Sequence, residues 1–120
     1  MESKRRHSLA TLNTFGVDAV AERYVRFDSE REIREFLHCR PLKGSAYLVL
    51  GGGSNLLFTG DFSGTVLHPR FKGISIVKES HAHAWVKVMA GETWDDLVAA
   101  AVAGGWGGIE NLSLIPGSVG

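Results

Sequence analysis

Apolar residues recur at helical spacing in two stretches of the chain. In the first stretch, Ile33, Phe36 and Leu37 belong to one apolar stripe. Ser29 precedes this stripe, and Glu32 lies three residues after Ser29, the spacing of a capping box, in which the two side chains satisfy backbone N–H groups at the start of the helix. The pattern predicts a helix that begins after Ser29 and ends before Pro41.

The second helical stretch starts near Thr93. Its apolar residues follow the i, i+3, i+4, i+7, i+8 pattern and are Trp94, Leu97, Val98, Ala101 and Val102. Asp96 stands at the capping-box position for Thr93, and Gly104-Gly105 supplies a C-terminal stop. A second helix is therefore expected between these limits.

Shorter apolar runs between and around the helices predict strands. The expected strands are 22–27, 47–50, 65–68, 74–78 and 84–90, and an apolar run at 56–58 follows a glycine-rich loop. Residues 1–10 are polar and are interpreted as a loose lead, and residues 13–16 as a turn. Several strands with two helices predict an α+β fold in one small domain covering residues 1–120.

Composition narrows the function classes. The 13 basic and 13 acidic residues cancel, which disfavours general nucleic-acid binding and membrane-surface binding. The single cysteine, Cys39, cannot form an internal disulfide, as expected in a reducing compartment. The N-terminal residues lack the apolar run of a secretory signal, and no stretch reaches the roughly 20 apolar residues of a membrane span. The cytoplasm is the expected location.

Glycine is the unusual component, at 15 of 120 residues, and much of it is clustered. In Gly51-Gly52-Gly53, followed by Ser54 and Asn55, successive backbone N–H groups could form a nest for an anion such as a nucleotide pyrophosphate. The stretch lacks the lysine of a P-loop and does not lead into a helix as a Rossmann fingerprint does. We expect a strand–loop–strand cradle, and a plain glycine-rich turn remains an equal alternative.

A second glycine loop closes the chain. Pro116 fixes one φ angle, and Gly117 and Gly120 allow backbone to approach a ligand closely. Alone, this stretch favours a plain loop, but two loops that each contain Gly-Ser favour a shared ligand. A Pro-Gly-Ser-Val-Gly ending is typical of the middle of a loop, so we expect the chain to be truncated.

Four motifs in order carry a resemblance to a known family. They are Asn13-Thr14-Phe15-Gly16, Gly51-Gly52-Gly53-Ser54-Asn55-Leu56-Leu57, Gly91-Glu92-Thr93-Trp94 and Glu110-Asn111-Leu112-Ser113-Leu114-Ile115-Pro116-Gly117-Ser118-Val119-Gly120. This set resembles the N-terminal third of the UDP-N-acetylenolpyruvoylglucosamine reductase family, from about residue 8 onward. The resemblance implies a truncated FAD-binding domain of the vanillyl-alcohol-oxidase type.

The resemblance also implies the cofactors and the residues that contact them. FAD would be bound non-covalently, its pyrophosphate in the first glycine loop and its flavin along the second. The implied cofactor-binding residues are Leu50, Gly51, Gly52, Gly53, Ser54, Asn55, Leu56, Ile115, Pro116, Gly117, Ser118 and Gly120. NADPH would be the reductant and a UDP-sugar enolpyruvyl ether the substrate, in peptidoglycan precursor synthesis by a monomeric protein. The family's catalytic serine, arginine and glutamate fall beyond Gly120, so this chain supplies no catalytic residue.

The remaining candidates are interpreted as structural. His81 and His83 lack a further ligand nearby and are expected in a solvated hairpin turn, so no metal site is expected. Cys39 is expected to be inert, and Asp95-Asp96 to be a favourable charge at a helix N-terminus. Trp94 is expected in the core, and Trp106 is expected to anchor a loop. Two other functions stay open: an oxidase of the same fold with covalent FAD, and a non-enzymatic nucleotide-binding module.

Overall fold

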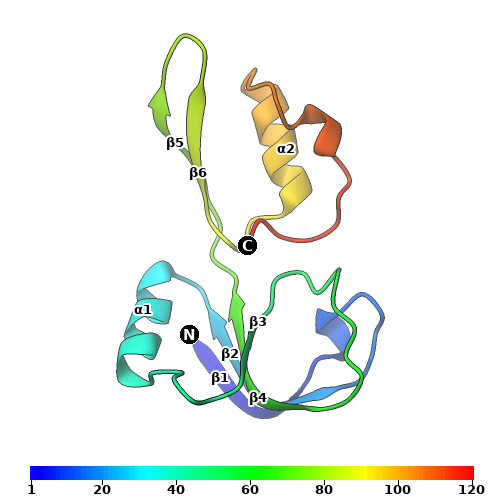
Figure 1. The fold of residues 1–120 in the computed structure, drawn as a ribbon. Coiled ribbons are helices and arrows are strands. Elements are labelled where there is room, and N and C mark those ends of the chain that lie inside the picture. Colours follow the sequence, from blue (N-terminus) through cyan, green and yellow to red (C-terminus); the bar gives the residue numbers. More distant parts are fainter.

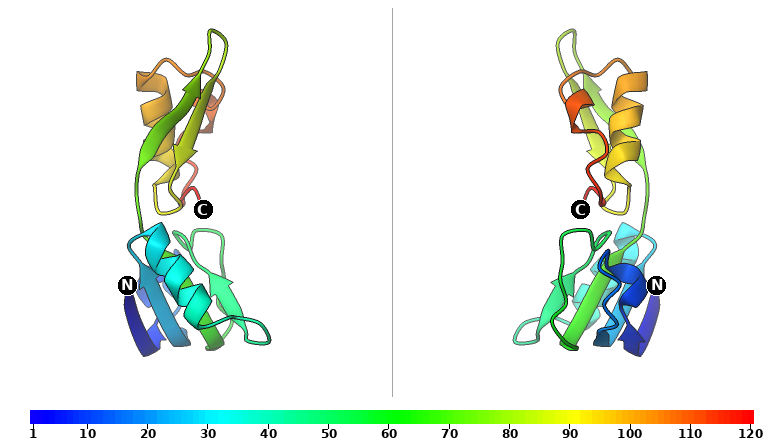
Figure 2. Two further views of the ribbon diagram at one scale, coloured as in Figure 1. Left: turned by 90° about the vertical axis from the view of Figure 1, so that its left-hand side faces the viewer. Right: turned by 90° about the vertical axis from the view of Figure 1, so that its right-hand side faces the viewer.

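The computed structural model describes all 120 residues and divides them into two lobes (Figure 1). The elements in chain order are β1 (Glu2–Ser8), η1 (Ala10–Leu12), β2 (Val20–Phe27), α1 (Glu30–Cys39), β3 (Tyr47–Val49), β4 (Phe62–Pro69), β5 (Ile74–Glu79), β6 (Ala84–Val88), α2 (Trp94–Ala103) and η2 (Glu110–Leu112). We call residues 1–70 the sheet lobe and residues 71–120 the hairpin lobe. The C-terminus returns to the junction between them (Figures 1 and 2). The mixed helices and strands confirm the α+β prediction.

The sheet lobe is built on a four-stranded sheet in the order β1-β2-β4-β3. β2 and β4 run parallel in the centre, β3 pairs parallel with β4, and β1 pairs antiparallel with β2. α1 lies in the connection from β2 to β3, and the first glycine loop lies in the connection from β3 to β4. This topology brings the chain that follows Val49 and the end of β4 to the same edge of the lobe.

The expectation of a loose polar lead at residues 1–10 is wrong. Residues 2–8 form strand β1, with Glu2 opposite Arg26 and Ser8 opposite Val20. β1 is an edge strand whose side chains are largely exposed, so it carries no apolar periodicity. Its place in the sheet comes from backbone pairing, which is common to all non-proline residues.

Each face of the sheet has its own core. One face packs a cluster that includes Tyr24 and Val66 against Leu9, beside η1, and Phe58, in the β3–β4 connection. The other face packs Val25, Phe27 and Leu67 against Phe36 of α1. β4 supplies both faces because successive side chains of a strand point to opposite sides. The first of these two faces is the one on which the first glycine loop lies.

The first predicted helix is confirmed together with its cap, but Leu37, expected in its apolar stripe, is 40% exposed. The Ser29 side chain accepts a hydrogen bond from the Glu32 N–H at 3.3 Å, and α1 begins at Glu30. On the outer face Arg31 pairs with Glu35 and Arg34 with Glu30, each at 2.7 Å. Local sequence alone specifies this element, since cap and side-chain pairs all lie within a few residues.

The second predicted helix forms, but three of its expected details are wrong. The Thr93 side chain makes no capping hydrogen bond, and Asp96 points instead toward Lys72 at 3.9 Å. Val102 is exposed, although it fits the helical stripe, because the buried face of α2 is narrow and consists of Leu97, Val98 and Ala101. Trp94 is only half-buried, and its indole N–H donates to the Leu112 carbonyl at 2.8 Å.

Two strand predictions also need correction. Residues 56–58 form no strand, so the loop after β3 continues to residue 61, and β4 then begins at Phe62. Phe58 enters the core without a strand partner and Leu56 packs against it, whereas Leu57 is 60% exposed. The strand expected at 84–90 ends at Val88.

β5 and β6 form a separate antiparallel hairpin beside α2 (Figure 2). Residues 80–83 connect the two strands, so His81 and His83 lie in the hairpin turn as expected. Trp106 packs on Gly104, where an added Cβ would lie 2.8 Å from the indole ring, and so anchors the loop as expected. No helix of the structure has both the length and the apolar character needed to cross a membrane.

Candidate cofactor-binding site

The first glycine loop leaves a row of backbone donors unused. Leu50 extends the pairing of β3 with β4, because its N–H donates to the Leu67 carbonyl at 2.8 Å. After Leu50, none of the backbone N–H groups of residues 51–55 donates to another group of the chain. Backbone N–H groups are normally paired, and an unpaired consecutive row of them is the composition of an anion-binding nest.

The shape of this loop is set by contact with the segment after η1. Gly53 has a φ of +62°, and an added Cβ would overlap the Leu12 carbonyl oxygen. The Gly53 carbonyl in turn accepts the Thr14 N–H at 3.1 Å. Glycine is required at this position by the left-handed conformation and by the close backbone approach together.

Asn13 holds that neighbouring segment in place and explains the turn predicted at residues 13–16. Its buried amide donates to the carbonyls of Leu9 at 2.8 Å and Val17 at 2.9 Å, and accepts the Val17 N–H at 3.0 Å. The side chain therefore satisfies three hydrogen bonds within one loop. The role of Asn13 is structural, and it positions the backbone against which Gly53 packs.

The two glycine loops, more than 60 residues apart in sequence, meet at the junction of the lobes. The Ser54 hydroxyl donates to the Pro116 carbonyl at 3.1 Å. A Cβ added at Gly52 would lie 3.1 Å from the Cα of Gly117, so the two backbones nearly touch. The sequence suggested a shared ligand from two separate loops, and the structure brings those loops into contact.

The second loop is bound to the hairpin lobe through its backbone. The Gly117 carbonyl accepts the Trp94 N–H at 3.0 Å, and the Val119 N–H donates to the Glu92 carbonyl at 2.9 Å. The Gly120 N–H donates to the Ala90 carbonyl at 3.1 Å. The second loop thereby runs beside the start of α2 and faces the first loop across the junction.

Glu92 is a residue of the site region that the sequence reasoning did not single out. It is 9% exposed, and its carboxylate accepts the Gly73 N–H at 2.8 Å and lies 3.5 Å from Lys72 Nζ. Its carbonyl also holds Val119. Glu92 thus joins the start of the hairpin to the second glycine loop. Its place within Gly91-Glu92-Thr93-Trp94 was the available signal.

Asp95 has a more specific role than the general helix-terminus charge that was expected. Its carboxylate accepts the Leu114 N–H at 2.7 Å and the Ser113 hydroxyl at 2.9 Å. These hydrogen bonds, the one from the Leu114 backbone first, lower the pKa of Asp95 below its ordinary value. Leu114 has a φ of +62°, so Asp95 holds a strained residue directly before the second loop.

Two hollows open beside the paired loops. One, of about 280 Å³, is lined by residues 49–56 together with Pro116, Gly117, Ser118 and Gly120. The other, of about 440 Å³, lies between the loops, the segment after η1 and the end of β4. All of the expected cofactor-binding residues line these hollows except Ile115, which lies outside both and is 48% exposed.

The larger hollow includes residues that the sequence reasoning missed. His68, Arg70 and Lys72 line it from the end of β4 and the chain that follows, and no acidic residue does so. Nothing in the spacing of these residues marks them. They reach the site because β4 ends beside the first glycine loop, which only the topology of the sheet shows.

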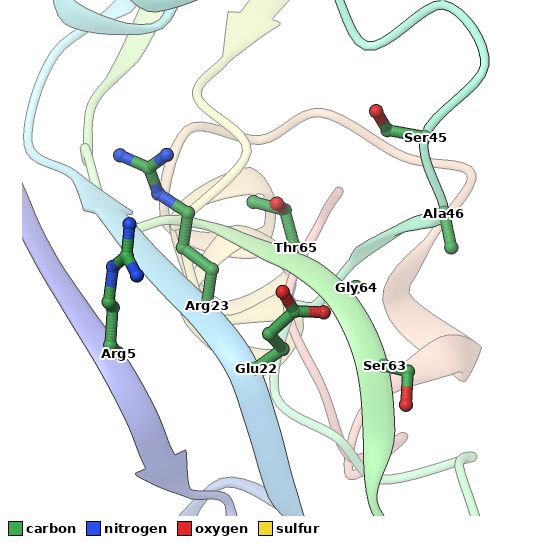
Figure 3. A pocket seen from close by; sticks show the side chains of 8 residues that line it. All are labelled: Arg5, Glu22, Arg23, Ser45, Ala46, Ser63, Gly64 and Thr65. Atoms are coloured by element: carbon green, nitrogen blue, oxygen red, sulfur yellow. The ribbon is translucent and has the colours of Figure 1, made fainter.

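A third hollow, of about 390 Å³, lies elsewhere on the sheet lobe and involves neither glycine loop (Figure 3). Arg5 and Arg23 face one another across β1 and β2, and Figure 3 shows their side chains beside Glu22. Arg23 is committed to other contacts, donating to Ser3 Oγ at 3.2 Å and lying over the Phe36 ring at 5.7 Å. This hollow is a gap between surface side chains, so the junction of the glycine loops remains the candidate site.

Comparison with known proteins assigns the class. Residues 21–120 match the family described as an FAD binding domain, and the chain belongs to that family. A cradle of unpaired backbone N–H groups, beside a hollow that no acidic residue lines, fits the diphosphate of such a dinucleotide.

Individual relatives are more specific. The chain is 45% identical to UDP-N-acetylenolpyruvoylglucosamine reductase of Bacteroides fragilis, and 42% identical to the protein of the same name from Flavobacterium johnsoniae. These alignments cover 98% and 100% of the chain, and 35% of each relative. The crystal structure of UDP-N-acetylenolpyruvylglucosamine reductase from Thermus caldophilus matches with a TM-score of 0.67 at 26% identity, over 99% of this chain and 39% of that one. The chain thus spans about a third of the relatives' length.

Proposed function

We propose that this chain is the FAD-binding part of an NADPH-dependent reductase that converts UDP-N-acetylglucosamine enolpyruvate to UDP-N-acetylmuramate. The observation that carries the proposal is the row of unpaired N–H groups at residues 51–55, facing a second glycine loop. The names of relatives at 42% and 45% identity supply the substrate and the reaction. The corresponding role is in peptidoglycan precursor synthesis, in the cytoplasm and as a monomer.

The residues of this chain would bind and orient the cofactor. Bound FAD would supply the hydride transfer from NADPH to the enolpyruvyl double bond. The Gly51–Asn55 backbone would donate to the diphosphate, with the Ser54 hydroxyl holding the second loop at a fixed distance. Asp95 would fix the segment that leads into that loop. In this proposal, residues 1–120 bind and orient the cofactor and take no part in proton transfer to the substrate.

An absorbance spectrum of the purified product of the complete reading frame, before and after acid precipitation, tests this proposal. A flavin spectrum that moves to the supernatant as FAD supports non-covalent binding, and NADPH-dependent reduction of UDP-N-acetylglucosamine enolpyruvate is then expected. Flavin that stays in the pellet would indicate an oxidase with covalent FAD instead. A colourless protein that takes up no added FAD would leave a non-enzymatic binding module.

A substitution in the cradle separates binding from folding. In Gly52→Val the new side chain would meet the Gly117 backbone and push the loops apart, because an added Cβ already lies 3.1 Å from the Gly117 Cα. We expect FAD affinity, measured by flavin fluorescence titration, to fall at least about 100-fold while the free energy of unfolding changes by less than about 2 kcal/mol.

The matched control is Gly60→Val in the same connection between β3 and β4. An added Cβ at Gly60 meets nothing within 4 Å, so this variant should bind FAD as the wild type does. Equal losses of affinity in both variants, or losses of stability that match the loss of affinity, would mark the loop as a structural turn only.

A further inference from the structure

A buried pair of side chains lies at the edge of the larger hollow and has no part in the proposed cradle. Tyr24 and His68 come from neighbouring strands and are 4% and 5% exposed. The Tyr24 hydroxyl lies 2.7 Å from His68 Nδ1, and the His7 ring covers Tyr24 with a centroid distance of 4.4 Å. A polar pair this deeply buried needs its hydrogen bonds satisfied, and this requirement restricts where its protons lie.

The Tyr24 hydroxyl is the donor of this hydrogen bond. It makes no other hydrogen bond, and Nδ1 is the acceptor within its reach. Burial raises the pKa of Tyr24, so the phenol keeps its proton. Burial, followed by the charges of Arg70 and Arg26, lowers the pKa of His68 to about 4, so the imidazole is neutral at pH 7. A neutral imidazole that accepts at Nδ1 carries its N–H at Nε2.

The Nε2 of His68 is then a donor without a partner in the chain. Nε2 makes no hydrogen bond within the chain, and it is accessible to solvent. In β4, His68 lies on the same side of the sheet as Val66, the side that carries η1 and the first glycine loop. His68 lines the larger hollow, and Nε2 is the ring nitrogen that its contact with Tyr24 leaves free.

The surroundings of this opening favour an anion. No acidic residue lines it, and Arg70, which does, makes no ion pair. Lys72 Nζ forms ion pairs with the carboxylates of Glu92 at 3.5 Å and Asp96 at 3.9 Å. Its charge is therefore partly neutralised and attracts an anion less strongly than the charge of Arg70 does. Thr93 places the N-terminus of α2, with its partial positive charge, at the same opening.

We propose that His68, held in one orientation by Tyr24, donates its Nε2–H to a phosphate oxygen of the FAD diphosphate, beside the N–H row of the first glycine loop. This inference rests on the proposed function, because FAD supplies the diphosphate. It adds a side-chain donor from the central strand to a cradle otherwise built from loop backbone. Tyr24 is a positioning residue, which acts through His68 without touching the cofactor.

Nitrogen NMR of the wild-type protein tests the inference without a substitution. The product of the complete reading frame is labelled with ¹⁵N-histidine, freed of flavin, and compared before and after addition of FAD at pH 7. We expect His68 to show a protonated Nε2 and an unprotonated Nδ1, and the Nε2 resonance to shift when FAD binds. A proton on Nδ1, or an Nε2 resonance that FAD leaves in place, would overturn the proposal.

Variants measure how much the contact contributes. His68→Phe keeps an aromatic ring but no donor, and FAD affinity should fall about 10- to 100-fold, the range for one hydrogen bond to a charged group. His68→Gln can still present an N–H, and should recover most of that loss. Tyr24→Phe should lose about threefold to 10-fold in affinity and allow the proton to shift to Nδ1, which a merely structural tyrosine would not do.

The control is His81→Phe, which changes the same residue type in the exposed hairpin turn and should leave FAD affinity unchanged. Wild-type affinity in a folded His68→Phe protein would overturn the inference while leaving the proposed function intact. Wild-type protein that binds no FAD would overturn both. If His68→Phe does not fold, the NMR comparison on the wild type decides the question.

Discussion

The two lobes differ in how they are stabilised. The sheet lobe contains both clusters of buried apolar residues, seven on one face of the sheet and four on the other. In the hairpin lobe the buried apolar residues are Leu97, Val98 and Ala101, all from α2. The hairpin itself leaves large apolar side chains exposed, with Val77 at 68% exposure. One lobe therefore has a core, and the other is held mainly by backbone hydrogen bonds.

This difference matters because the site lies between the lobes. The first glycine loop and His68 are fixed by the core of the sheet lobe, whereas the second loop is fixed by Glu92, Trp94 and Ala90 of the hairpin lobe. Local opening is easiest where few apolar contacts must break. We expect the sheet lobe to supply a preformed half of the cradle, and the hairpin lobe to gain most of its order when the ligand binds.

The largest effect on stability should come from the core of the sheet lobe. Phe27 is fully buried and meets Phe36 edge-on at 5.3 Å between ring centroids. Phe27→Ala should lower the free energy of unfolding by about 3–5 kcal/mol, from lost burial and the cavity left behind. Urea denaturation followed by circular dichroism measures this loss. A loss below about 1 kcal/mol would contradict the idea that this core carries the lobe.

A truncation in the hairpin lobe should cost less and act locally. Leu97 keeps 9% of its surface exposed, so Leu97→Ala should cost about 2 kcal/mol, the low end for such changes. Hydrogen exchange should show lost protection in α2 and unchanged protection in β2 and β4. If protection falls equally in both lobes, they unfold as one unit and the contrast between them fails.

Acid should weaken the sheet lobe through His68. The folded-state pKa is lowered from its ordinary value of 6.5 to about 4, so the unfolded state takes up a proton first as pH falls. The contribution of His68 to the free energy of unfolding is therefore fully present above pH 6.5 and decreases as the pH falls from 6.5 toward 4. Below pH 4 this contribution no longer changes. The loss should be smaller than that of the core truncations, because solvent reaches Nε2 and screens the charge.

Denaturation curves at pH 7 and pH 5 measure this effect. The His68→Phe protein should show a smaller difference between the two pH values than the wild type, since the titrating group is gone. An unchanged difference would assign the acid sensitivity to other groups.

The smallest effect should come from the surface of the sheet lobe. Arg31 is highly exposed and pairs with Glu35 across one helical turn. Arg31→Gln should lower the free energy of unfolding by no more than about 0.5 kcal/mol, and added salt should remove the difference. A loss as large as that of Leu97→Ala would mean that surface pairs, and not the core, hold α1 in place.

The sequence was most informative where the determining contacts are local. The start of α1 follows from Ser29 and Glu32, and the position of the hairpin turn follows from the runs on either side of His81. The sequence was misleading at two apolar patterns. Residues 56–58 suggested a strand but form a loop, and Val102 fits the helical stripe but is exposed. β1 left no signal, because an exposed edge strand is selected for pairing and not for burial.

By itself, the sequence determined the two helices, the α+β class and the two glycine loops that a dinucleotide would need. Each of these follows from residues that are neighbours along the chain. Only the tertiary structure decided that the loops meet through Ser54 and Pro116, and that His68 is paired with Tyr24 beside them. Those partners are 62 and 44 residues apart, and a periodic pattern records which face of an element is buried, but not which distant residue it is buried against.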